Sequence, residues 1–185
     1  EWFKQAFLPN TDFAEIDREA QSHQPGDVLF LPYLVGTNAP EFDRDACGVF
    51  FGLRSAHNAF DLALAVMEGV CHLLRKNCDR IRACNTPIER ILATGGGAKS
   101  AVWCQMQADI TGIPVYIPVE KEAALLGAAM IGATSAGVFS SLADAAEQTV
   151  SIARSYEPQP SAVYERKHRQ FLALYEAMLA VQRMD

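Results

Sequence analysis

The sequence has little of what marks several common classes of protein. No run of Lys or Arg is longer than two residues and the net charge is −6, which argues against nucleic acid as the partner. The five cysteines form no Cys-x-x-Cys pair and the four histidines are scattered, so we expect no metal site. An odd number of cysteines without a disulfide pattern favours reduced, partly buried thiols, as in a cytoplasmic protein.

The longest stretch without a charged residue, 123–143, invites comparison with a membrane span. It contains glycine, serine and threonine and is only weakly hydrophobic. We therefore expect a buried helix that ends in a turn near Ala136-Gly137, and no membrane segment. Apolar residues make up 50% of the chain, enough for the core of one domain. Because the first residue is Glu1, we also expect the chain to begin inside a longer protein.

Short apolar runs alternate with helical periodicity, and this pattern predicts an α/β layered domain. A linker is predicted at 154–161, and the helix after it is expected to dock on the body of the domain. The predicted helices are 1–24 (broken at Pro9-Asn10), 55–80, 101–111, 122–135, 144–153 and 162–182; the predicted strands are 28–33, 48–53, 90–94 and 115–118.

The most informative stretch is Ile91–Ser100, where a short strand is predicted to run into three glycines and a helix beginning at Ser100. Backbone amides at such a turn, together with the helix start, suit a phosphate group. The Walker A pattern fails, because Ala93 and Ala98 stand where it needs glycine. The dinucleotide pattern fails at Ser100. A glycine turn without a ligand stays open as the alternative, and a lone Lys99 at a helix start is ordinarily solvated.

Several segments together resemble the C-terminal domain of the FGGY carbohydrate kinases. The second signature of that family is matched at every position by Gly48, Phe50, Gly52-Leu53, Asp61-Leu62 and Ala65-Val66-Met67-Glu68. Collinear matches follow at Thr94–Trp103, Asp109–Val115, Glu122–Ala129 and Tyr156-Glu157-Pro158. The resemblance covers nearly the whole chain, and within the family the glycine turn is most similar to that of the xylulose kinases.

The resemblance implies a ribonuclease H-like, actin-like ATPase domain over residues 1–185, the C-terminal half of a two-domain sugar kinase. It implies ATP and Mg²⁺ as cofactors and transfer of the γ-phosphoryl group to a ketopentose such as D-xylulose, giving the 5-phosphate. The implied nucleotide-binding residues are Gly95, Gly96, Gly97, Ala98 and Ser100, the last standing where some relatives carry an adenosine-contacting Asn.

The same resemblance places the general-base aspartate and a Gly-Thr-Ser phosphate loop upstream, outside this chain. The candidate aspartates here, at 12, 43, 61 and 109, lack the glycine-rich context of the base, so no catalytic residue is assigned. We expect the isolated chain to bind ATP weakly without turnover, because phosphoryl transfer needs an oriented nucleophile. The expected partners are the sugar, ATP and the N-terminal sugar-binding domain of the same protein, and a homodimer is compatible with the family.

Two alternatives stay open. The substrate could be another sugar or polyol of the family, such as ribulose, gluconate or glycerol. The chain could also belong to a non-catalytic actin-like nucleotide-binding module. Glu68, beside the apolar stripe of helix 55–80, is expected to be structural, although helical spacing alone favours an exposed charge. Its predicted partner is a loop backbone or Arg54.

Overall fold

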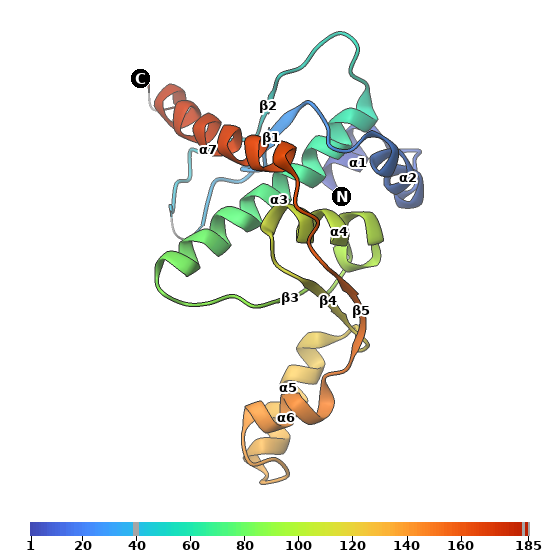
Figure 1. Cartoon of the computed structure of the whole chain (residues 1–185), viewed down its shortest axis with the longest axis vertical. Helices are drawn as coiled ribbons and strands as arrows, with labels where there is room; N and C mark the ends of the chain where they lie inside the picture. The colour runs from blue at the N-terminus through green and yellow to red at the C-terminus, as the bar shows by residue number, and fades with distance from the viewer. Residues whose placement is uncertain (39–40, 183, 185) are drawn as a thin grey trace.

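The computed structural model describes residues 1–38, 41–182 and 184. From α3 onward, strands β3, β4 and β5 are interspersed with helices, which confirms the predicted α/β class (Figure 1). In chain order the elements are α1 (Trp2–Phe7), α2 (Phe13–His23), β1 (Leu29–Leu31), β2 (Val49–Phe51), α3 (Ala59–Ala83), β3 (Ile91–Leu92), the 3-10 turn η1 (Gly97–Lys99), α4 (Ala101–Thr111), β4 (Val115–Pro118), α5 (Ala123–Ser135), α6 (Leu142–Thr149), β5 (Ile152–Tyr156) and α7 (Ala162–Gln182).

The long helix α3 runs through the middle of the body, and α1, α2, α4 and α7 pack around it (Figure 1). It begins at a capping box: Asn58 Oδ1 accepts from Phe60 N at 2.7 Å, and Asp61 Oδ2 accepts from Asn58 N at 2.8 Å. The start predicted at Ser55 was therefore too early, because the reciprocal bonds at Asn58 define the first turn.

Helix α3 lies against the buried strand β1, which pairs antiparallel with β2. A Cβ atom added at Gly69 would lie 2.4 Å from the Phe30 carbonyl oxygen, so the helix and the strand approach too closely for any side chain there. This contact sets the position of α3 over the two-stranded sheet.

A second sheet has the order β3-β4-β5, with β3 and β4 parallel and β4 and β5 antiparallel. Strand β5 corrects two predictions, because the helix predicted at 144–153 ends at Thr149 and the linker predicted at 154–161 begins inside the strand. Arg154 pairs with Ile117 of β4. The pairing is long-range, so local pattern alone could not reveal it. Residues 157–161 connect β5 to α7, whose predicted bounds are confirmed.

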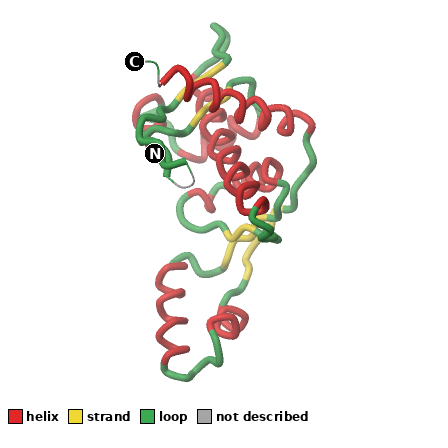
Figure 2. The backbone as a smooth tube through the Cα atoms, turned by 90° about the vertical axis from the view of Figure 1, so that its left-hand side faces the viewer, coloured by secondary structure: helices red, strands yellow, loops and turns green. Residues whose placement is uncertain are grey.

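Helices α5 and α6 project from the sheet as a separate hairpin of helices (Figures 1 and 2). No residue of α5 is buried, and Leu125 is 68% exposed, so the prediction of a buried helix was wrong for this chain. The predicted turn is confirmed, since Gly137 has a φ of 75° and donates to the Thr134 carbonyl oxygen at 3.0 Å.

Helix α7 packs against α3 and β1, and a buried ion pair joins it to α3. Glu68 is 1% exposed, accepts from Gly26 N at 2.9 Å and pairs with Lys167 Nζ. The predicted hydrogen bond between Glu68 and a loop backbone is confirmed. The alternative of an exposed Glu68 and the predicted pairing with Arg54 were wrong. Burial raises the pKa of Glu68, while Lys167 and the Gly26 amide oppose that shift.

All five cysteines are free thiols, as predicted. Cys71, Cys78 and Cys104 are buried, and burial raises the pKa of each of these thiols. Cys47 and Cys84 are exposed.

Candidate nucleotide site

The glycine turn joins β3 to α4, as predicted. Gly95 has a φ of 76°, in the left-handed region that favours glycine. Lys99 N donates to the Gly96 carbonyl oxygen at 3.2 Å and closes the 3-10 turn. Ser100 then caps α4, because its Oγ accepts from Trp103 N at 3.0 Å.

Gly96 and Gly97 differ in how closely the protein packs around them. A Cβ atom at Gly97 would lie 3.3 Å from the Trp103 ring, so packing restricts that position. Gly96 has ordinary helical angles (φ −63°, ψ −43°), and nothing lies within 4 Å of an added Cβ atom. The fold therefore tolerates a side chain at Gly96. Because glycine has no side chain, the backbone at Gly96 is open to close approach by a ligand.

Two donors are available at the turn. Among the described residues, the amides of Gly97 and Ala98 have no protein acceptor, whereas those of Lys99 and Ser100 bond within the turn. Both free amides lie just before α4, whose N-terminus adds a partial positive charge. An anionic or hydroxyl oxygen of a ligand could accept from them.

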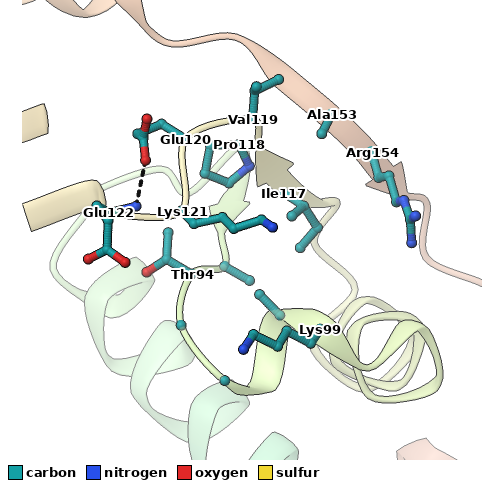
Figure 3. Close-up of a pocket in the computed structure, with 14 residues that line it drawn as sticks. Thr94, Lys99, Ile117, Pro118, Val119, Glu120, Lys121, Glu122, Ala153 and Arg154 are labelled. Carbon is teal, nitrogen blue, oxygen red and sulfur yellow. Dashed lines mark hydrogen bonds between the residues drawn. The ribbon is translucent and has the colours of Figure 1, made fainter.

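On one side of the turn lies a polar hollow of about 500 Å³ (Figure 3). Three cations reach it from different segments: Lys99 from η1, Lys121 from the loop after β4, and Arg154 from β5. Two carboxylates also line it, and Glu120 Oε1 accepts from Glu122 N at 2.8 Å. The hollow is lined by Ala93, Thr94, Gly95, Gly96, Ala98, Lys99, Ile117, Pro118, Val119, Glu120, Lys121, Glu122, Ala153 and Arg154.

On the other side lies an apolar hollow of about 540 Å³ between α1, α2, α3 and the turn. Trp103 and Met67 both line this hollow, and Trp103 Nε1 donates to the Met67 carbonyl oxygen at 3.1 Å. Asp17 of α2 also lines it and accepts from Ser100 Oγ at 2.8 Å. The hollow is lined by Glu1, Phe3, Lys4, Phe13, Ala14, Ile16, Asp17, Ala63, Val66, Met67, Gly96, Gly97, Lys99, Ser100 and Trp103.

The structure thus brings the predicted residues together as a ridge between two hollows. Gly95 and Ala98 face the polar hollow, Gly97 and Ser100 the apolar one, and Gly96 lines both. Sequence reasoning missed Asp17, which lies 83 positions from Ser100. No local signal could have found it, because only the packing of α2 beside α4 places the carboxylate there.

The four aspartates considered from the sequence have structural partners. Asp12 accepts from Glu15 N and caps α2, and Asp43 accepts from Asp45 N. Asp61 is part of the capping box of α3, and Asp109 accepts from the side chain of Gln105 and from Gln159 N. None of these contacts resembles the oriented base of a phosphoryl transfer.

Within the described ranges, no group of three or more His, Cys, Asp or Glu side chains is placed to hold a metal ion. No helix in the described part of the chain combines the length and apolarity needed to cross a bilayer.

Solved structures share the fold of this chain. Xylulose kinase from Lactobacillus acidophilus superposes with a TM-score of 0.88 at 27% identity, over 97% of this chain and 37% of that one. Gluconate kinase from the same organism gives 0.85 at 28% identity, over 96% and 37%. The domain has the ribonuclease H-like, actin-like ATPase fold. Residues 4–136 match the C-terminal domain of the FGGY family of carbohydrate kinases, and the chain belongs to that family.

Curated relatives agree with this assignment. Xylulose kinase from Bacillus subtilis is 33% identical over 178 residues, which are 95% of this chain and 35% of the relative. The L-xylulose/3-keto-L-gulonate kinase of Escherichia coli is 30% identical over 182 residues, 96% and 36% of the two chains. The chain therefore spans about a third of the length of the curated relatives it matches.

Proposed function

We propose that this chain is the nucleotide-binding part of a sugar kinase, which transfers the γ-phosphoryl group of ATP to a sugar hydroxyl. The proposed sugar is a ketopentose such as D-xylulose, giving the 5-phosphate, because relatives named xylulose kinase recur among the similar proteins and structures. We propose the cytoplasm as its location, where free thiols persist. The observation that carries the nucleotide role is the open backbone at Gly96, which the fold itself does not require.

In this proposal the nucleotide lies along the ridge formed by Gly95, Gly96 and Gly97. The amides of Gly97 and Ala98 donate to ribose or phosphate oxygens, and the cations of the polar hollow offset the phosphate charge. Such positioning and charge neutralisation are the main requirements of phosphoryl transfer. The proposed general base comes from upstream sequence, as the resemblance to the family implies. The four candidate aspartates of this chain are held in structural contacts instead.

Mg²⁺, when bound with ATP, neutralises charge on the phosphate oxygens. The described residues offer no cluster of carboxylates for it, so we assign no protein ligand to the metal in this chain. The chain's own contribution is to bind and orient the nucleotide.

The partner we propose is an N-terminal domain of the same protein, seated against α5 and the second sheet. Helix α5 is apolar and charge-free, and such a helix is ordinarily buried. β3 lies at the edge of its sheet, and Leu92 is 49% exposed. An exposed edge beside apolar surface calls for a covering element. The curated relatives, of which this chain spans about a third, have additional sequence that could supply the cover.

The test of the proposed function is a kinase assay on the full-length protein with ATP, Mg²⁺ and a panel of pentuloses, pentitols and hexonates. We expect ADP release that depends on the sugar and is fastest with D-xylulose. A different preferred sugar would overturn only the substrate assignment. No sugar-dependent ADP release across the panel would overturn the kinase and favour the non-catalytic module.

Gly96→Ala tests the site itself. We expect nucleotide affinity in the full-length protein to fall about tenfold or more, because the new methyl group occupies the surface that the nucleotide approaches. The ligand-free unfolding temperature should stay the same or rise slightly, since alanine fits the helical angles of Gly96. Calorimetry measures the affinity, and unchanged ATP binding would contradict the assignment.

A further inference from the structure

Asp17 has no role in the function proposed above, yet it is the carboxylate that Ser100 holds in the apolar hollow. The Ser100 hydroxyl donates its single proton to Asp17 Oδ1 at 2.8 Å and accepts from Trp103 N at 3.0 Å. The hydroxyl therefore has no proton left to donate to a ligand. In this hollow, the Ser100 hydroxyl orients the carboxylate of Asp17.

The second oxygen of Asp17, Oδ2, has no donor within the described residues. The hollow that Asp17 lines is largely apolar, with Phe13, Met67 and Trp103 among its lining residues, and its other charged residues are Glu1, Lys4 and Lys99. Lys4 lies over the Phe13 ring, with its Nζ 5.7 Å from the ring centroid. A flat heteroaromatic group that carries an amino group on its edge suits such a setting, because its faces meet apolar side chains and its edge meets an acceptor.

We infer that Asp17 determines the nucleobase specificity of this protein: Oδ2 accepts a hydrogen bond from the 6-amino group of adenine, while the purine ring packs in the apolar hollow. The inference rests on the proposed function, since it takes the nucleotide to lie along Gly96 and Gly97, which line the same hollow. A 6-keto purine would place an oxygen against the carboxylate oxygen. Such an acceptor–acceptor contact in a partly desolvated site disfavours inosine and guanine nucleotides.

A double-mutant cycle on the full-length protein tests this directly. The two ligands are ATP and purine riboside 5′-triphosphate, which lacks only the 6-amino group. We expect the unmodified protein to prefer ATP on the order of tenfold, the usual effect of a hydrogen bond to a charged group. In Asp17→Ala we expect the two ligands to bind equally. Asp17→Asn should gain affinity for ITP relative to the unmodified protein, because its amide can donate to the keto oxygen.

Glu15→Ala is the matched control, because Glu15 lies on the same helix and lines neither hollow. It should keep the full preference for ATP. Ligand-free unfolding temperatures of the variants report whether the fold is retained. Equal binding of both triphosphates by the unmodified protein would overturn the role of Asp17, as would an equal loss for both in Asp17→Ala. Absence of any ATP binding by the unmodified protein would instead overturn the proposed function.

Discussion

His72 and His168 face each other in the seam between α3 and α7, with ring centroids 5.5 Å apart. His72 is buried, and neither of its ring nitrogens has a hydrogen-bond partner in the described part of the chain. Burial lowers the pKa of His72 to about 3, and the neighbouring His168, Lys167 and Arg75 add to that shift. Burial also lowers the pKa of His168, although Asp79 and Glu165 oppose the change. Both rings are therefore neutral at pH 7.

Acid should destabilise the fold through these two residues. Their folded pKa lies below the unfolded value of about 6.5, so the unfolded state binds more protons as the pH falls below that value. We expect the free energy of unfolding to fall below pH 6.5, by up to about 1.4 kcal/mol per pH unit for His72. His72→Leu should weaken this dependence between pH 6.5 and 4. Urea unfolding across that range measures it, and an unchanged slope in the variant would contradict the assignment.

Helix α7 is held by polar contacts that sit inside the core. Lys167 Nζ donates to the Gly26 and Val28 carbonyl oxygens, at 2.6 and 3.3 Å, as well as pairing with Glu68. The N-terminal part of α7 is thus bonded both to α3 and to the segment just before β1. Removing one partner of such a buried ion pair lowers the free energy of unfolding, because the remaining charge is buried without water or a counter-charge.

Lys167→Met should destabilise the chain by about 3–5 kcal/mol, because it leaves Glu68 buried without its cation. Adding Glu68→Gln to that variant should recover part of the loss, since the unpaired charge is then removed. The control is Arg75→Ala, which removes a more exposed ion pair with Glu165 on the same seam and a hydrogen bond to the Ile110 carbonyl oxygen, and it should cost about 1–2 kcal/mol. Urea unfolding compares them, and a similar cost for Lys167→Met and Arg75→Ala would contradict the anchoring role.

The body and the α5–α6 hairpin differ in how completely they are packed. The body buries its core between α3 and the surrounding helices, whereas α5 has no buried residue and leaves Leu125 and Ile131 exposed. A protein that has this surface exposed would tend to associate through it. The proposed N-terminal domain would cover α5 and the edge of β3 together.

Ile131→Asp in the full-length protein tests whether the N-terminal domain covers α5. Ile131 is 58% exposed in this chain, so a loss of stability in the longer protein would report its burial by the other domain. We expect a loss of about 2 kcal/mol or more. Val181→Asp on α7 is the control, because Val181 is 57% exposed and should change stability by about 0.5 kcal/mol or less. Differential scanning calorimetry measures both.

Equal effects of these two variants would contradict the proposed seat. Dissociation of a dimer by Ile131→Asp, seen by sedimentation, would show instead that a second copy covers α5.

Much of the site could be predicted because its signals are local. The strand, the glycine turn and the cap at Ser100 lie within ten consecutive residues, and spacing and capping act over that distance. The same is true of the turn at Gly137 and the bounds of α7. The end of α6 and strand β5 could not be predicted, because pairing with β4 decides between strand and linker at 152–156.

The sequence by itself determined the α/β order, the glycine turn and the family signature, because each depends on neighbours along the chain. Only the tertiary structure decided which residues that are distant in the sequence contact one another. Lys167 reaches Glu68 over 99 positions and Asp17 reaches Ser100 over 83, and neither pairing has a local signal. The packing of α2, α3, α4 and α7 brings these partners together, and it also determines that Gly96 stays open on both sides.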